Sequence, residues 1–238
     1  MKVNDPKSSI KTRPRKIFKN IFMASLCLFV AILACHFAWL FSGSGRWELL
    51  EKKDGIAVYS LKTPGIALKK FKAVMSVQSS LSAAVKIMQD PHFCDSVGCM
   101  GSEMIERVDD KLQYYYFKWA MPLFFKTRDF VVKSRFSQDP ATKAVLLQIT
   151  AVPERIPLSS CCFRIVDMNN SWRFIPQGNG DILIEYMVDT DQGGFFPYFL
   201  SNMAGSKFMH SVLIKTRAFF QENQDAYRDA KFDFLEEA

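Results

Sequence analysis

A long stretch without charge near the amino terminus constrains this chain more than any other feature. No charged residue occurs between Lys19 and Arg46, and residues 21–41 read IFMASLCLFVAILACHFAWLF. A helix needs about 20 apolar residues to cross the hydrocarbon core of a bilayer. The sequence therefore predicts a transmembrane anchor over residues 21–41.

A cleaved signal peptide is the alternative. Its apolar region usually has about 7 to 15 residues, which is shorter than this run. Ser42 and Ser44, however, are small residues of the kind found at a cleavage site. Cleavage would give a secreted or periplasmic protein, whereas the length of the run favours an uncleaved anchor.

Basic residues are concentrated before the apolar run. The chain has 31 lysines and arginines, 24 acidic residues and a net charge of +7, but residues 1–20 hold seven of the basic residues and one acid. The rest of the chain is nearly neutral, which disfavours a nucleic-acid partner. Because basic flanks stay in the cytoplasm, we expect residues 1–20 to be a cytoplasmic tail. The domain beyond the membrane is then extracytoplasmic, and periplasmic if the source is bacterial.

The chain beyond the apolar run is predicted to be one domain. Residues 42–45 form a short, flexible Ser/Gly linker, and no repeat or low-complexity segment interrupts residues 46–238. Alternating apolar and polar residues predict several strands, with a hairpin turn at residues 178–181. These strands cover residues 70–77, 113–119, 130–136, 144–152, 163–176 and 182–188.

Helical periodicity appears in residues 81–88 and again in residues 199–224. The second segment is long and carries one apolar stripe. Several antiparallel strands with a long terminal helix predict an α+β fold in which the helix crosses the concave face of the sheet. The 22 phenylalanines are compatible with an apolar cavity, but composition alone favours a well-packed core.

Several motifs, read together and in order, resemble the START domain, the lipid-transfer domain related to the steroidogenic acute regulatory protein. The resemblance covers residues 45–225. Trp47 with DGIAVY at 54–59 is similar to the opening of that family, in which a short helix leads into the first strand. The later matches are KFK at 70–72, RDFV at 128–131, Arg164 with SW at 171–172, DQGGFFP at 191–197, and Asn202.

The resemblance implies a helix-grip fold, in which a curved antiparallel sheet surrounds the terminal helix and encloses a tunnel for one lipid. The expected partners are a phospholipid or sterol-like lipid and the membrane itself, with no cofactor. Strand alternation and the helical stripe predict which side chains line such a tunnel. They are Tyr116, Arg128, Phe130, Val132, Ile149, Trp172, Tyr186, Leu200, Met203 and Phe208.

Arg128 is the one cation in this set, and a buried guanidinium needs an anion or several acceptors. Some START proteins have an acidic residue on the preceding strand for this purpose, but residues 112–127 contain none. A lipid head group, Asp189 or Asp191 are possible partners inside a tunnel. Asp129 or backbone carbonyls are the alternatives for an arginine at a strand end.

The residues expected of an enzyme are scarce. The sequence has no HExxH, GxSxG or phosphate-binding glycine loop, so no enzymatic activity is predicted. Relatives of the helix-grip fold include cyclases, so the alternative is an enzyme acting on a polycyclic or lipid-like substrate through Tyr116 and Tyr186. A ligand-free, membrane-tethered scaffold is a third hypothesis.

The cysteines leave two further questions open. His92, Cys94 and Cys99 form an HxCx4C pattern, but a closed zinc site takes four ligands and only three are evident, so no metal site is predicted. In an extracytoplasmic domain, Cys94 and Cys99 could instead be oxidised. The pairing of these two cysteines with Cys161 and Cys162 cannot be read from the sequence.

Overall fold

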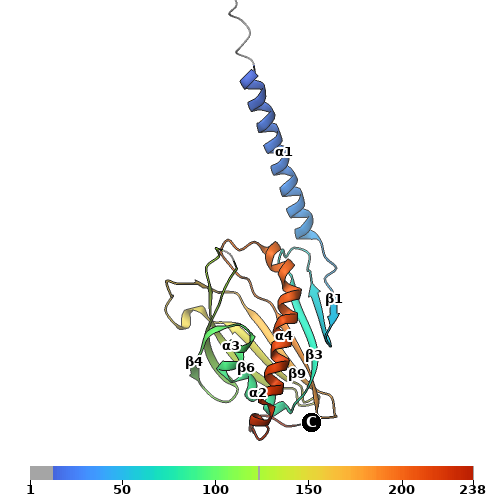
Figure 1. Ribbon diagram of the computed structural model, residues 1–238, viewed down its shortest axis with the longest axis vertical. Coiled ribbons are helices and arrows are strands. Elements are labelled where there is room, and N and C mark those ends of the chain that lie inside the picture. The colour runs from blue at the N-terminus through green and yellow to red at the C-terminus, as the bar shows by residue number, and fades with distance from the viewer. Residues whose placement is uncertain (1–12, 123, 238) are drawn as a thin grey trace, which may run out of the picture.

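A computed structural model describes residues 13–122 and 124–237, so part of the predicted basic tail, residues 1–12, lies outside the described residues. Helix α1 (Arg13–Phe41) projects from the rest of the protein (Figure 1). Its segment Lys16–Phe41 is long and apolar enough to cross a membrane and none of it is buried. A membrane anchor and a signal sequence both satisfy this description.

The chain after α1 forms a curved, ten-stranded sheet (Figure 1). Its order is β1-β2-β3-β10-β9-β7-β6-β5-β4, all antiparallel, with the short β8 added parallel to β6. The strands are β1 (Trp47–Lys53), β2 (Ile56–Leu61), β3 (Lys70–Gln78), β4 (Met100–Arg107), β5 (Leu112–Trp119), β6 (Arg128–Gln138), β7 (Val145–Ala151), β8 (Phe163–Arg164), β9 (Asn169–Pro176) and β10 (Asp181–Val188).

Three helices and a 3-10 turn complete the domain: α2 (Leu81–Met88), α3 (Pro91–Val97), the turn η1 (Pro153–Arg155) and α4 (Tyr198–Tyr227). The long helix α4 packs on β2 and β3 and against α2 and α3. Gly205 allows this close approach, because a Cβ there would come within 2.2 Å of the Phe71 ring on β3. The predicted α+β, helix-grip architecture is therefore confirmed.

The predicted helices and most of the predicted strands are present, but the segment predicted as a strand over residues 163–176 is divided into β8 and β9, and the edges of the sheet differ from expectation. Residues 47–53 form strand β1 and not the short helix that the START resemblance implied, because they pair with β2 along its length. Strand β4 was not predicted. It lies at the opposite edge with largely exposed side chains, so its sequence lacks the alternation that marks a half-buried strand.

Residues 42–45, predicted to be a flexible linker, instead form a turn that contacts with Lys62 fix in place; we call it the held turn. Gly43 has φ +108°, and a Cβ there would lie 2.3 Å from the Lys62 carbonyl oxygen, so only glycine fits. Lys62 Nζ donates to the carbonyls of Leu40 and Ser42 at 3.2 and 3.1 Å, which caps the end of α1. Burial, and to a lesser degree the charge of Lys69, lowers the pKa of Lys62. The last turn of α1 is thereby fixed to the domain.

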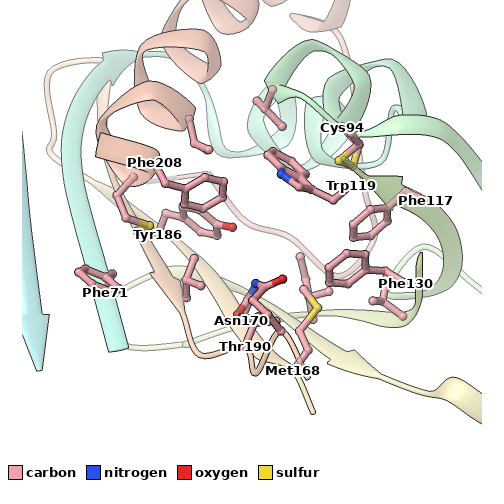
Figure 2. Close-up of a pocket in the computed structure, with 18 of the residues that line it drawn as sticks. Phe71, Cys94, Phe117, Trp119, Phe130, Met168, Asn170, Tyr186, Thr190 and Phe208 are labelled. Atoms are coloured by element: carbon pink, nitrogen blue, oxygen red, sulfur yellow. Dashed lines mark hydrogen bonds between the residues drawn. A yellow bond between two sulfur atoms is a disulfide. The ribbon is translucent and has the colours of Figure 1, made fainter. Parts of the chain in front are cut away.

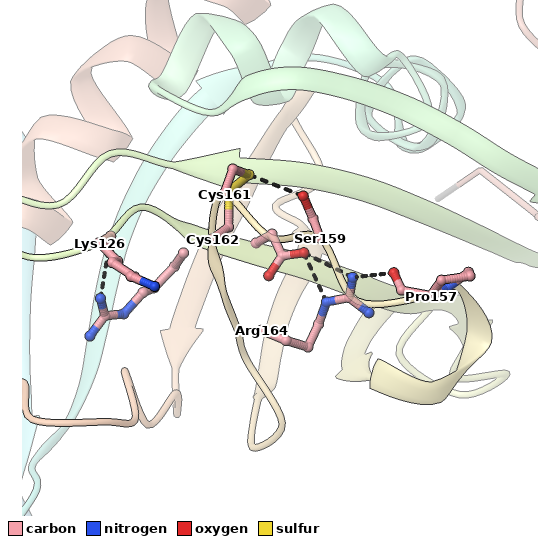
Figure 3. Close-up of a disulfide and its surroundings, with 8 residues drawn as sticks. Lys126, Pro157, Ser159, Cys161, Cys162 and Arg164 are labelled. Atoms are coloured by element: carbon pink, nitrogen blue, oxygen red, sulfur yellow. Dashed lines mark hydrogen bonds and ion pairs between the residues drawn. A yellow bond between two sulfur atoms is a disulfide. The ribbon is translucent and has the colours of Figure 1, made fainter.

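A buried ion pair fixes the loop that precedes β8. Arg164 donates from Nε and Nη2 to Asp129 Oδ2 at 3.0 and 2.8 Å, and the two side chains are 4% and 1% exposed. Arg164 also donates to the carbonyls of Pro153, Ile156 and Pro157, and Figure 3 shows the contact with Pro157. Asp129 is thus the partner of Arg164, not of Arg128.

We predict that Asp129→Ala lowers the free energy of unfolding by about 3–5 kcal/mol, because it leaves the Arg164 guanidinium buried without its anion. Guanidinium unfolding of the detergent-solubilised protein, followed by tryptophan fluorescence, measures the change. The matched control is Asp225→Ala, which breaks an exposed Asp–Arg pair with Arg228 and should cost less than about 1 kcal/mol. Equal effects of the two variants would contradict the prediction.

Candidate functional site

A cavity of about 380 Å³ lies between the concave face of the sheet and α4. Figure 2 shows aromatic side chains around it, among them Phe71, Phe117, Trp119, Phe130 and Phe208. Those on strands point inward because alternate residues of a strand face the same side, and Phe208 points inward from α4. The volume is in the lower part of the range of small-molecule sites, which is about 300–1,000 Å³.

Most of the side chains predicted to line a tunnel border this cavity. They are Phe130, Val132, Ile149, Trp172, Tyr186, Leu200 and Phe208. Contact of these residues with a lipid remains a prediction.

Tyr116 and Met203 do not border the cavity, and their predicted role is wrong on geometric grounds. Tyr115 and Phe117 line it, so the alternation of β5 turns the intervening Tyr116 to the other face. Met203 is 72% exposed. At 3.6 residues per turn, the cavity-lining residues Ala204, Gly205, Phe208 and Met209 share the inner face of α4, and Met203 is on the opposite face.

Arg128 is buried but also lies outside the cavity. Its Nε donates to the Gln192 carbonyl at 2.9 Å and its Nη2 to the Gly193 carbonyl at 3.2 Å, with Nη1 bonded to the Lys126 carbonyl. Burial lowers the pKa of the guanidinium. Backbone carbonyls are therefore its partners, as one sequence alternative held, and Arg128 fixes the loop between β10 and α4.

The sequence missed the polar part of the cavity wall. Asn170 and Thr190 lie side by side there, next to Met168 (Figure 2). Asn170 lies two residues before Trp172 on β9, so strand alternation already predicts that both side chains face the cavity. Tyr186 stacks on Trp172 with ring centroids 3.9 Å apart, and burial raises the pKa of its hydroxyl.

Two disulfides are present. Cys94–Cys99 joins α3 to the turn that precedes β4, and both residues border the cavity. This bond uses both thiols of the HxCx4C pattern. The second, Cys161–Cys162, joins adjacent residues in the loop before β8, where Ser159 contacts Cys161 (Figure 3). Cys27 and Cys35, both in α1, are free.

Phenylalanines gather where the cavity opens. The cavity-lining residues Ala120, Pro122 and Ala204 are exposed, which places the opening beside the β5–β6 loop and the first turns of α4. We call the phenylalanines around it the aromatic rim: Phe124, Phe125, Phe195, Phe196 and Phe199. Within the rim, the Phe125 and Phe196 rings are 4.9 Å apart, and Phe195 and Phe124 are 100% and 86% exposed.

The start of α4, which carries the rim residue Phe199, lies next to the end of α1 (Figure 1). His36 Nδ1 of α1 is 3.1 Å from the hydroxyl of Tyr198, at the start of α4. Trp39 Nε1 donates to the Ala67 carbonyl at 2.9 Å, close to the cavity residue Leu68. The opening of the cavity and the carboxyl end of α1 are therefore neighbours.

Comparisons with known proteins identify the fold. No protein-family model matches the chain. An uncharacterized protein of Pseudomonas aeruginosa is 24% identical over 157 residues, which is 66% of this chain and 77% of that protein.

Two solved structures have the same fold. The STAR-related lipid transfer protein of Xanthomonas axonopodis, fragment 25–204, has a TM-score of 0.69 and 23% identity and covers 75% of this chain and 99% of its own. The human StarD13 lipid transfer and protein localization domain has a TM-score of 0.64 and 18% identity and covers 90% and 99%. The chain therefore has the START fold, as the sequence motifs indicated.

Proposed function

We propose that this chain is a membrane-anchored lipid-binding protein that holds one amphipathic lipid in its cavity and exchanges it with the membrane beside α1. The apolar cavity under α4 is the observation that carries this proposal. The START-fold proteins of similar structure, whose names describe lipid transfer, support it.

The energetics of an apolar cavity suit exchange with a bilayer. Moving a methylene group from water into apolar surroundings gains about 0.8 kcal/mol, so the cavity shields a lipid chain from water. Moving the same group from bilayer to cavity changes little, because both environments are apolar. The free-energy change for moving a lipid chain from the bilayer into the cavity is then close to zero, provided that the opening of the cavity meets the membrane.

The position of α1 supports contact between the opening of the cavity and the membrane. The helix ends at Phe41, and the held turn at residues 42–45 keeps the domain against this end. The aromatic rim lies beside it, and aromatic side chains favour the interface between bilayer and water. The opening of the cavity would then face the lipid head groups of the membrane that α1 spans.

Binding fits the cavity better than the alternative of catalysis. Of the two tyrosines nominated for an enzyme, Tyr116 faces away from the cavity. Tyr186 faces into it, but burial raises the pKa of its hydroxyl, which keeps the group protonated at neutral pH. It therefore lacks the lowered pKa that a general base needs.

We expect the protein to carry lipid through purification and to move labelled lipid between vesicles in proportion to its concentration. Native mass spectrometry and a fluorescence transfer assay measure the two effects. Phe208→Glu should reduce lipid retention about tenfold or more, because it places an unpaired carboxylate in the cavity. Met203→Glu, one turn away on the outer face of α4, is the matched control and should retain lipid as the wild type does.

Two results would contradict this function. Failure to bind any lipid from a total extract would favour the scaffold hypothesis. Chemical conversion of a bound lipid, lost in Tyr186→Phe, would favour an enzyme.

The aromatic rim gives a separate prediction. The double variant Phe124→Asp, Phe195→Asp should slow lipid transfer about tenfold without changing lipid retention, because charged side chains oppose insertion of the rim into the bilayer. Exposed Val108 lies in the β4–β5 loop, and Val108→Asp serves as the control. Unchanged transfer by the double variant would show that the rim does not meet the membrane.

We further propose that α1 stays uncleaved, with the amino terminus cytoplasmic and the domain on the other side. The basic residues before the span and the two disulfides support this side, because disulfides persist outside the cytosol. Protease added to cells with an opened outer barrier should digest residues 46–238. Digestion only from the cytoplasmic side would contradict the topology, and a mature protein lacking residues 1–41 would indicate signal cleavage.

A further inference from the structure

The disulfide between the adjacent residues Cys161 and Cys162 lies in the turn that leads into β8. Cys161 is exposed to solvent and Cys162 is half-buried, so a thiol from outside can reach the bond. The other disulfide is less accessible, because Cys94 is half-buried and Cys99 is buried. Exposed disulfides are the ones that exchange readily with thiols. Of the two bonds, Cys161–Cys162 is therefore the better substrate for thiol–disulfide exchange.

The surroundings of this bond favour release of a thiolate. Ser159 Oγ lies 3.1 Å from Cys161 Sγ, so the hydroxyl can donate to that sulfur. The exposed Lys126 adds a positive charge to the surroundings of the disulfide (Figure 3). Positive charge stabilises a thiolate, and a more stable thiolate leaves faster when a disulfide is attacked.

The disulfide directly precedes Phe163, the first residue of β8. The Phe163 backbone N–H donates to the Thr127 carbonyl at 2.9 Å, and Phe163 pairs with Arg128 on β6. Its ring packs on the backbone of Gly193 and Gly194, since a Cβ on Gly193 would come within 2.6 Å of the ring. Because β8 has only two residues, the turn that holds the disulfide also determines where this ring lies.

The loop between β10 and α4, on which Phe163 packs, forms part of the opening of the cavity. Its residues Gln192 and Phe196 border the cavity. The Arg128 guanidinium donates to the Gln192 and Gly193 carbonyls and lies 5.2 Å from the centre of the Phe163 ring and 5.8 Å from that of Phe196. Phe163, Arg128 and the β10–α4 loop are therefore packed as one unit, directly after the disulfide in the chain.

We propose that Cys161–Cys162 is a thiol–disulfide exchange site through which a dithiol opens the cavity. The oxidised bond keeps Phe163 against the β10–α4 loop. Reduction lets residues 161–162 extend, because adjacent side chains of an extended chain point to opposite sides. Phe163 then leaves the loop, and lipid enters and leaves faster. This inference rests on the proposed lipid-binding function, which the exchange regulates.

The exchange takes two steps. A thiolate of the dithiol attacks the exposed Cys161 Sγ and forms a mixed disulfide, while the Cys161–Cys162 bond breaks and Cys162 leaves as a thiolate. The second thiolate of the dithiol then attacks the first sulfur of the dithiol, and Cys161 leaves as a thiolate that the Ser159 hydroxyl stabilises. Two electrons pass to the protein, the dithiol becomes a disulfide, and its two thiol protons are taken up by Cys161 and Cys162.

The first experiment locates the exchange. The detergent-solubilised, full-length protein is treated with dithiothreitol or with reduced thioredoxin, and the new thiols are alkylated and mapped by mass spectrometry. Cys161 and Cys162 should be reduced at least about tenfold faster than Cys94 and Cys99. Faster reduction by thioredoxin would identify a protein dithiol as the better source, and faster reduction by dithiothreitol a small one. Reduction of Cys94–Cys99 first, or of neither bond, would overturn the exchange site.

The second experiment tests the link to the opening. Reduction should increase amide hydrogen exchange in residues 191–197 and speed lipid transfer about threefold to tenfold, the change expected for loss of one cation–π contact. Phe163→Ala should produce both effects in the oxidised protein, and reduction should then add nothing. Leu158→Ala, at an exposed position in the same loop, is the matched control and should respond to dithiol as the wild type does.

A variant without the bond separates the two disulfides. The double variant Cys161→Ser, Cys162→Ser should behave as the reduced protein does, and dithiol should not change it further, although it can still reduce Cys94–Cys99. Unchanged hydrogen exchange in residues 191–197 after reduction of Cys161–Cys162 would overturn the switch and leave lipid binding intact. Failure to bind lipid in either redox state would instead contradict the proposed function, and hydrogen exchange would still decide whether reduction releases the loop.

Discussion

The close packing of α4 on β2 and β3 is the constraint on which the rest of the structure depends. Gly205 lets the helix approach the Phe71 ring to a distance that no larger residue permits. Trp119 of β5 reaches Phe208 of α4, with ring centroids 5.4 Å apart, but the inward side chains of the strands and the helix still leave a cavity between them. Large apolar residues then surround a cavity, which is how a sequence rich in phenylalanine can leave space inside itself.

Three buried cations organise the loops around the opening, and each is satisfied largely by backbone carbonyls. Lys62 caps the end of α1, Arg128 holds the loop before α4, and Arg164 holds the loop before β8 together with Asp129. A buried cation is tolerated only when its donors are used, so these loops are fixed by the same hydrogen bonds that make the cations stable. The opening, the aromatic rim and the anchor are thereby kept together.

The placement of α1 gives the cavity a defined relation to a bilayer. A domain on a long flexible tether would sample many orientations, whereas the held turn at residues 42–45 joins α1 to the edge of the opening. In our proposal, this geometry brings the aromatic rim to the membrane surface. A lipid that enters the cavity would then pass the rim.

The sequence by itself determined the apolar helix, the alternating strands, the long terminal helix and part of the cavity wall, because these follow from local periodicity. It did not determine β1 and β4, whose exposed edges carry no alternation, nor the face that Tyr116 and Met203 occupy. An apolar stripe shows that a helix is buried on one side, but the rotation of α4 against β3 decides which residues meet the cavity. The partners of Arg128 were likewise decided by the tertiary structure, since they lie in a loop distant in the chain.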